Sequence, residues 1–419
     1  MKYDFDSYLL YERNRSVGFT VRIRVVMKEE VRPEILGPAA VKAFKRYPYY
    51  SQTVSVDDSG AYILHPCDAP IAVMPDELPV KLGGEETNGL LFAITYRNRD
   101  IYFNFSHNFC GGCGAMFWIK TTLWQYLTDM GFEIPEEDIK LPGTPVTPGE
   151  VAVPDPSTLP GDEPLATSGA GDSFVPLTDY MEVMKDPQYA GPYYYPISIR
   201  KTELLKYARE NDGSPNSILS AVLYKMSTRS FADAEQLSGK VICNYRGDVG
   251  CPETHCDLVR FIRTVYKPVM KDWPVDKIST ATRGSMYLQM EPEYSWRECR
   301  ELYEMRQGID EQPDLEAKKK YAVEHSLIQR RARDTFAVSY VGNAGWGALG
   351  DYIEGVYSIT DGHLMLEVNA TEEGFCISFQ TLWKDGKYLK GFLKVLDEEG
   401  IHYQAGELER KNLPVMAIM

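Results

Sequence analysis

The chain has 419 residues, of which 44% are apolar and 25% charged, and its formal net charge is −15. This composition is typical of a soluble globular protein of two or three domains, and it excludes a disordered or collagen-like chain. The acidic balance argues against nucleic acid as a partner, because binding to a phosphate backbone depends on lysine and arginine.

The first 145 residues alternate between strand and helix patterns. Apolar residues at every second position predict a strand, and Pro33 stands where a proline favours the first turn of a helix. In chain order we expect a strand over 19–25, a helix over 33–44, a hairpin over 53–64, a second hairpin over 90–105 and a helix over 116–131.

Residues 142–196 interrupt this rhythm, since they hold 11 of the 26 prolines and show no periodicity. A long stretch of this kind is typical of a linker or a functional lid. We therefore predict three parts: an N-terminal domain over 1–145, a Pro-rich linker or lid over 146–194, and a C-terminal domain over 195–419.

The alternation resumes in the C-terminal part, which repeats the plan of the first half. In chain order the predicted elements are a strand over 195–200, helices over 202–210 and 214–226, a strand over 240–245, a helix over 315–331, strands over 336–340, 364–369 and 375–382, and a helix over 387–398. In both halves a strand, a helix and hairpins are followed by a strand that runs into a glycine loop.

Targeting signals are not predicted. No apolar signal segment precedes the first acidic residues, and no stretch approaches the roughly 18 apolar residues of a membrane span. The eight cysteines are spread from Cys67 to Cys376, unlike those of a secreted disulfide-rich domain. We therefore expect a cytoplasmic protein with reduced thiols and no membrane span.

The most informative segment is the loop around His107, which follows an apolar strand and opens a helix. Gly111, Gly112 and Gly114 line this junction, and glycine lets a ligand or another backbone come close because it has no Cβ. A single imidazole at such a place is suited to act as a general base near neutral pH. The alternative from the residues alone is a structural histidine that caps the strand.

These residues resemble the superfamily of CoA-dependent acyltransferases. This group includes chloramphenicol acetyltransferases, alcohol acetyltransferases and the condensation domains of peptide synthetases, and its signature is His-x-x-x-Asp-Gly. Here the segment reads His107-Asn-Phe-Cys-Gly111-Gly112. The similarity extends along the chain in order and spacing, and it is greatest to the alcohol acetyltransferase-like bacterial proteins. Its further segments are Arg46-Tyr-Pro48, Asn216 to Met226, Asn244-Tyr-Arg246, Ser339 to Gly345 and Gly345-Trp346-Gly347.

The resemblance implies an α/β (α+β) fold of two chloramphenicol-acetyltransferase-like halves, each a mostly mixed sheet with flanking helices, that form a pseudo-dimer around a central channel. It implies transfer of an acyl group from a CoA or carrier thioester to a small alcohol or amine. His107 would be the general base. The implied partners are a small-molecule acyl donor and acceptor, with acyl-CoA as co-substrate and an acyl carrier protein as the alternative donor. No bound cofactor and no metal are implied.

The resemblance also implies the residues around the substrate. Gly111, Gly112, Ser339, Asn343 and Trp346 would line its site, and Ser339 or Asn343 would donate to the oxyanion of the tetrahedral intermediate.

The sequence departs from the signature at Gly111, which replaces the aspartate. In the family this carboxylate pairs with an arginine and holds the loop, which a glycine cannot do. Arg246 would then be unpaired or would bind an acidic ligand. The substitution leaves a second hypothesis open, in which the chain keeps the fold as a ligand-binding or assembly protein without catalysis.

The cysteines offer two other interpretations. Cys110-Gly-Gly-Cys113 at a helix start is a possible thiol redox motif, although its surroundings do not resemble a thioredoxin unit. Cys110 is alternatively a nucleophile beside His107. Cys251, His255 and Cys256 are potential zinc ligands, but a structural zinc site needs four, so the others would come from Cys110 and Cys113. We favour the histidine mechanism.

Overall fold

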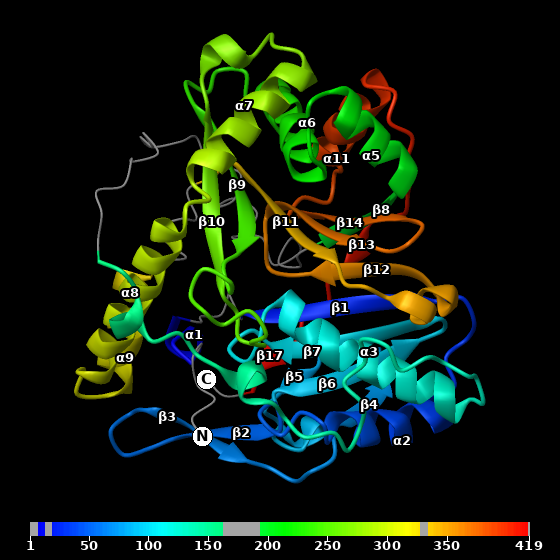
Figure 1. Ribbon diagram of the computed structural model, residues 1–419, viewed down its shortest axis with the longest axis vertical. Coiled ribbons are helices and arrows are strands. Elements are labelled where there is room, and N and C mark those ends of the chain that lie inside the picture. Colours follow the sequence, from blue (N-terminus) through cyan, green and yellow to red (C-terminus); the bar gives the residue numbers. More distant parts are fainter. Residues whose placement is uncertain (1–6, 13–18, 162–192, 327–333, 418–419) are drawn as a thin grey trace.

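The computed structural model describes residues 7–12, 19–161, 193–326 and 334–417. Two β-sheets form its frame, one below the other in Figure 1, and helices cover their outer faces. Most of the predicted linker, residues 162–192, and the end of the helix predicted over 315–331 lie outside the described residues.

The first sheet has five strands in the order β12-β1-β7-β6-β4. Its strands are β1 (Thr20–Met27), β4 (Ala72–Pro75), β6 (Phe92–Arg97), β7 (Asp100–Ser106) and β12 (Ile353–Ile359). Two separate short pairs, β2 (Gln52–Val56) with β3 (Tyr62–Pro66) and β5 (Lys81–Leu82) with β17 (Val415–Met416), lie outside this sheet.

The second sheet has the order β10-β9-β11-β13-β14-β8-β15, and β16 also pairs with β8. Its strands are β8 (Tyr193–Arg200), β9 (Leu237–Asn244), β10 (Val259–Tyr266), β11 (Phe336–Asn343), β13 (Leu364–Ala370), β14 (Gly374–Thr381), β15 (Gln404–Ala405) and β16 (Glu409–Arg410).

The central strands of the two sheets repeat one topology. β1 pairs antiparallel with β7, β7 antiparallel with β6, and β6 parallel with β4. In the second sheet β8, β14, β13 and β11 repeat these relations in the same order. The chain is thus built as two halves of one plan.

Nine α-helices complete the described part of the chain. They are α1 (Leu9–Glu12), α2 (Pro33–Phe44), α3 (Gly112–Asp129), α5 (Lys201–Glu210), α6 (Pro215–Ser230), α7 (Val275–Leu288), α8 (Pro292–Asp310), α9 (Leu315–His325) and α11 (Lys387–Glu398).

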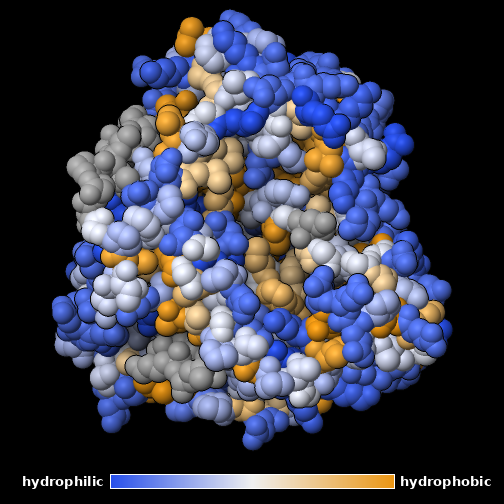
Figure 2. All heavy atoms as spheres, viewed as in Figure 1, coloured by the Kyte–Doolittle hydropathy of each residue, from blue (hydrophilic) through white to orange (hydrophobic). Residues whose placement is uncertain are grey.

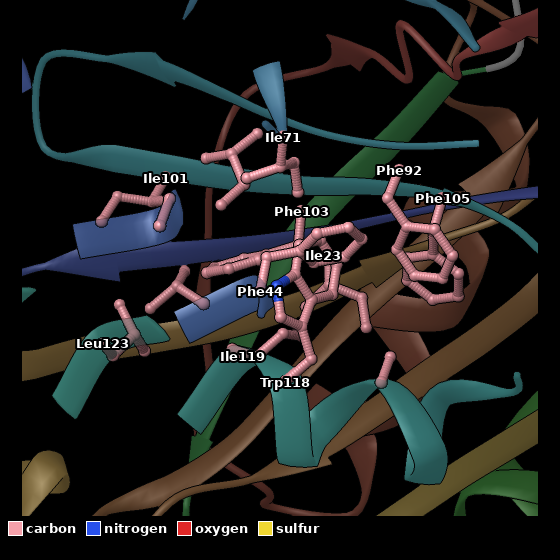
Figure 3. Packing of buried hydrophobic residues seen from close by; sticks show 14 of the residues in the cluster. Ile23, Phe44, Ile71, Phe92, Ile101, Phe103, Phe105, Trp118, Ile119 and Leu123 are labelled. Atoms are coloured by element: carbon pink, nitrogen blue, oxygen red, sulfur yellow. The ribbon is translucent and has the colours of Figure 1, made fainter. Parts of the chain in front are cut away.

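Helices α2 and α3 cover one face of the first sheet and form its core (Figure 3). The Trp118 ring of α3 lies 5.2 Å from Phe92 and 5.0 Å from Phe103, centroid to centroid. Helix α3 ends at Asp129, and Gly131 beyond it has a φ of 96° that allows the Phe132 N–H to bond back to the Leu127 carbonyl. This packing fixes the helix that begins directly after the His107 loop.

The opposite face of the first sheet is polar, because β1 alternates between apolar residues and arginines. Arg22 forms a 2.6 Å ion pair with Asp76, and both side chains are only 2% exposed. Arg24 pairs with Asp100 at 2.9 Å and with Glu409 at 2.8 Å. The C-terminal segment therefore covers the face that the helices leave open.

The second half has its own core, formed between its sheet and the helices α5, α6, α7 and α11. A third, smaller cluster joins α1, α8 and α9. The halves are nevertheless interlocked, because β12 comes from the second half and is the edge strand of the first sheet, with Arg22 opposite Ile359. The boundaries at residues 145 and 195 remain a prediction.

Most elements predicted from the sequence are confirmed within a few residues. They include β1, α2, the β2–β3 and β6–β7 hairpins, α3, β8, α6, β11, β13, β14 and α11. Strands β10 and β12 were not predicted, and neither were α7 and α8.

Candidate functional site

His107 lies in the short loop between β7 and α3. Its backbone N–H donates to the Phe19 carbonyl at 2.8 Å, so the loop continues the β1–β7 pairing for one residue. The hydroxyl of Ser106 donates to the Asn108 side chain. The imidazole itself is 28% exposed, which leaves it accessible to a small molecule.

The three glycines at the start of α3 are each placed against the second half of the chain. A Cβ at Gly111 would lie 2.1 Å from Asp257 Oδ1, and one at Gly114 would lie 2.2 Å from the His255 carbonyl oxygen. A Cβ at Gly112 would be 3.2 Å from Val341. A Cβ at Gly114 would collide with backbone, and one at Gly111 or Gly112 would require the neighbouring side chain to move, so these glycines let the two halves meet closely at the His107 loop.

A carboxylate of the second half faces the imidazole. His107 Nδ1 lies 3.3 Å from Asp257 Oδ2, and the Asp257 side chain is 13% exposed. Nδ1 is buried, and it has no aligned hydrogen-bond acceptor among the described residues. Asp257 was not among the residues predicted for the site.

Asp257 belongs to the connection between β9 and β10, which Arg246 holds in place. The Arg246 guanidinium donates to the Thr254 carbonyl at 2.8 Å and to the Cys256 carbonyl at 2.5 Å. Two of its nitrogens thus hold the loop that carries Asp257. The third, Nη1, is buried without a hydrogen-bond partner among the described residues, so the expectation that Arg246 is unpaired or binds an acidic ligand stays a prediction.

His255, in the same loop, is a buried residue that packs against the first half of the chain. The Tyr49 hydroxyl lies 2.6 Å from its Nδ1, and its ring stacks on Phe117 with 4.5 Å between centroids. Burial lowers the pKa of His255 to about 3, so the ring is neutral at physiological pH. Its backbone N–H donates to the Glu150 carbonyl at 2.9 Å.

Glu150 in turn anchors this region to the end of α2. Its carboxylate accepts from Arg46 at 2.8 Å, and both side chains are almost fully buried. Burial by itself raises the pKa of a carboxyl group, but Arg46 and Lys140 outweigh it and lower the pKa of Glu150 to about 2. The arginine of the Arg46-Tyr-Pro48 segment thus forms a buried structural ion pair.

A cluster of buried titratable groups in the second half interacts electrostatically with His107. Burial raises the pKa of Glu367 to about 7, against hydrogen bonds from Ser339 and Thr360 and the nearby charge of His107. Burial also raises the pKa of Asp361, which His107 again opposes. Burial lowers the pKa of Lys411 to about 7.

The structure brings some of the predicted site residues together. Gly111 caps α3 and Gly112 begins it, so both adjoin the His107 loop. Ser339 lies on β11 and bonds to Glu367. Asn343 ends β11, where its backbone pairs with Ala370. Trp346 is buried in the first core, and its indole N–H makes no hydrogen bond among the described residues.

The end of β11 is also fastened to α3 across the junction of the halves. Lys120 donates to the Ala344 carbonyl at 3.2 Å, and the Cys113 thiol lies 3.8 Å from the Val341 carbonyl. Figure 2 shows the surface hollowed in the middle of this face, between the two halves, with apolar residues in its depth. A small ligand therefore has room to enter between the halves.

The cysteine interpretations gain little from this geometry. Cys110 is buried, and burial raises the pKa of the Cys113 thiol although Arg246 opposes the shift. An activated thiol needs the opposite change. Among the described residues, no group of three or more His, Cys, Asp or Glu side chains is arranged to hold a metal ion.

Comparison of the sequence with protein-family models and with curated proteins finds no match. The structure, in contrast, resembles solved structures over nearly its full length. TRI101 of F. sporotrichioides, solved with coenzyme A and T-2, is 10% identical with a TM-score of 0.60, and the match covers 95% of this chain and 98% of that one.

Two further structures extend the comparison. Polyketide synthase associated protein 5 from Mycobacterium tuberculosis is 10% identical, with a TM-score of 0.57 and coverage of 94% and 96%. The first condensation domain of the CDA synthetase is 10% identical, with a TM-score of 0.54 and coverage of 96% and 98%. The chain has the fold of the CoA-dependent acyltransferase and condensation-domain superfamily. The predicted fold class is thereby confirmed, including its two similar halves.

None of the described helices is long and apolar enough to cross a membrane. At about 10% identity, the similarity to solved structures establishes the fold alone. The chemistry has to be argued from the residues of this chain.

Proposed function

We propose that the protein transfers an acyl group from a CoA or carrier thioester to a small alcohol or amine, with His107 as the general base. The observation that carries this proposal is the position of His107. Its imidazole is partly exposed at the junction of the two halves, and a carboxylate faces its Nδ1 at 3.3 Å. An imidazole so placed presents Nε2 as the atom that accepts a proton.

The proposed reaction has two steps. In the first, Nε2 takes the proton of the acceptor hydroxyl or amine while the acceptor attacks the thioester carbonyl carbon, and the carbonyl electron pair moves to oxygen. In the second, this pair re-forms the carbonyl bond, the carbon–sulfur bond breaks, and the thiolate receives the proton from the imidazolium. The products are an ester or amide and the free thiol.

The oxyanion of the intermediate requires donors from the protein. We assign this role to Ser339 or Asn343, on the resemblance of their segment to the alcohol acetyltransferase-like proteins. The bond from Ser339 to Glu367 places its hydroxyl in the polar cluster on the second-half side of His107. Structures related by fold were solved with coenzyme A and with ethyl coenzyme A, which supports acyl-CoA as the first donor to test.

The test measures thiol release from acetyl-CoA and longer acyl-CoAs with a panel of small alcohols and amines. Wild type should turn over at least one pair, and His107→Ala should reduce kcat/KM by about 10²- to 10⁴-fold, because general-base catalysis contributes that much. His65→Ala is the matched control, since this exposed histidine in β3 lies outside the junction. It should keep wild-type turnover.

The same assays and variants test the competing hypothesis of a non-catalytic member of this fold. Turnover that persists in His107→Ala contradicts the role of the histidine. Saturable binding of CoA without turnover of any pair indicates that the panel lacks the acceptor. The absence of both turnover and binding supports a non-catalytic member of this fold.

A further inference from the structure

We propose that Asp257 is a positioning residue for His107, and that the second half of the chain supplies through it the carboxylate that the signature motif carries at position 111. Its part in catalysis rests on the proposed acyltransferase function. The contact itself stands on the geometry of the junction.

The Asp257 carboxylate lies in the space that a side chain at position 111 would occupy. A Cβ on residue 111 would lie 2.1 Å from Asp257 Oδ1 and 2.9 Å from its carboxyl carbon. An aspartate at 111 would therefore displace the Asp257 side chain from its present position.

The Asp257 carboxylate is also oriented towards the His107 ring. Asp257 Oδ2 lies 3.3 Å from His107 Nδ1, while its other oxygen faces Gly111. A carboxylate beside Nδ1 favours the tautomer with the proton on that nitrogen, so the lone pair is on Nε2, where the acceptor is deprotonated. Catalytic contacts are often longer or poorly aligned without substrate and tighten when it binds.

Hydrogen bonds fix the backbone of the loop that carries Asp257. Arg246 bonds to the carbonyls of Thr254 and Cys256, and the His255 N–H bonds to the Glu150 carbonyl. The residue after the aspartate continues this order, since the Tyr245 N–H donates to the Leu258 carbonyl at 3.0 Å as β9 and β10 begin to pair. A positioning group is effective when its own backbone is fixed in this way.

The surrounding charges leave this role to Asp257. Asp361 and Glu367 also act on His107, but burial raises the pKa of both carboxyls and so favours their neutral forms. Lys411 donates to the carbonyls of Thr360 and Gly362. Asp257 is the carboxylate in direct contact with the ring.

The decisive variant is Asp257→Asn, with nitrogen NMR of the histidine rings as the readout. The chain has six histidines, and the signal missing in His107→Ala identifies the one of interest. At about pH 9, where an ordinary imidazole is neutral, wild type should hold its proton on Nδ1. In Asp257→Asn the proton should move to Nε2, and kcat/KM should fall about 10- to 100-fold.

The matched control is Glu253→Gln, an exposed carboxylate of the same loop. It should leave both the tautomer and the turnover unchanged. A thermal unfolding curve for each variant shows whether the fold is kept. An unchanged tautomer in a folded Asp257→Asn overturns the inference.

A position exchange gives a second test that does not depend on removing a charge. Gly111→Asp alone should reduce turnover, because its side chain displaces the Asp257 carboxylate from His107. Asp257→Gly alone should lose the carboxylate. The double variant Gly111→Asp/Asp257→Gly should recover at least about tenfold in kcat/KM over either single variant, because the two sites are directly coupled. A double variant no better than the singles also overturns the inference.

The two proposals fail in different ways. If wild type shows no turnover, the tautomer of His107 in wild type and Asp257→Asn still decides whether Asp257 orients the ring. If His107→Ala is inactive but Asp257→Asn matches wild type in tautomer and rate, the acyltransferase stands and the role of Asp257 does not.

Discussion

The two strand-to-helix junctions of the molecule share one local plan but face different surroundings. β7 leads through residues 107–111 into α3, and β14 leads through residues 382–386 into α11. At the first junction the glycines lie against Asp257, Val341 and His255 of the other half. At the second, Gly386 lies against Tyr195 of its own half, and α11 packs beside α6 at the outer end of the molecule (Figure 1).

The residues of the second junction match this difference. Leu382 and Trp383 are buried in the core of their own half, while Lys384 and Asp385 are exposed. A repeated fold therefore does not create a repeated site. The candidate site arises only where a junction meets segments of the other half, and that condition holds at His107.

The largest expected difference is in the unfolding free energy that is lost when an ion pair is removed from each half. Glu150→Gln leaves Arg46 buried without its counter-charge next to the loop of Asp257, and this should destabilise the protein by about 3–5 kcal/mol. In the second half, Arg229 and Glu398 join α6 to the C-terminal end of α11, but both side chains are 42% exposed. Glu398→Gln should therefore change little. Denaturant unfolding measures both, and equal losses would contradict a special anchoring of the first junction.

A second difference is the titration of the polar cluster beside His107. Burial raises the folded-state pKa of Glu367 from 4.5 to about 7, so the stability provided by its protonated form is complete below about pH 4.5 and is lost as the pH rises through about 7. Between pH 5 and pH 8, wild type should lose up to about 3 kcal/mol more than Glu367→Gln.

Lys411 has the opposite sign, because its lowered pKa of about 7 means that its contribution is lost as the pH falls from its ordinary range through 7. The charge of Glu367 itself raises the pKa of Lys411, so the difference between wild type and Glu367→Gln reports the titration of Glu367 together with its effect on Lys411. The exposed Glu372→Gln, in the turn of the same hairpin, serves as the control. Parallel pH curves for wild type and Glu367→Gln would contradict the titration assigned to Glu367.

The smallest expected effects come from adding one methyl group at each junction. Gly111→Ala meets the Asp257 carboxylate and should cost about 1–3 kcal/mol in unfolding free energy, with reduced turnover. Gly386→Ala is strained by a φ of 65° and should cost about 1 kcal/mol at unchanged turnover. Reduced turnover in Gly386→Ala, with the fold kept, would show that the second junction also takes part in the site.

The sequence allows the frame of the site to be predicted because its signals are local. An apolar hairpin, a glycine-lined loop and an amphipathic helix follow each other over residues 90–131, and the structure has them in that order. The similarity of His107 and its neighbours to a known signature added the fold class. Neither the local signals nor the signature depends on which distant residues come together.

What could not be predicted depends on tertiary contacts. Strand β10 was missed because Arg260 and Thr264 point inward while Phe261 points outward, so hydrophobicity does not separate its two faces. Asp257 stands 150 positions after His107 in a loop that was considered only for metal ligands. The sequence shows that Gly111 lacks a carboxylate, but not that another residue occupies its space.

Strand β12 has a consequence for the synthesis of the chain. One edge of β1 pairs with β7 as soon as the β6–β7 hairpin is made, but the other edge pairs with residues that follow roughly 330 positions later. At ribosomal rates of about 5–20 residues per second, that edge stays open for roughly 20 to 70 seconds. During this time β1 offers unpaired backbone groups to other nascent chains. Glu409, the second partner of Arg24, is made later still, so the pairing of this arginine is also completed only after β12.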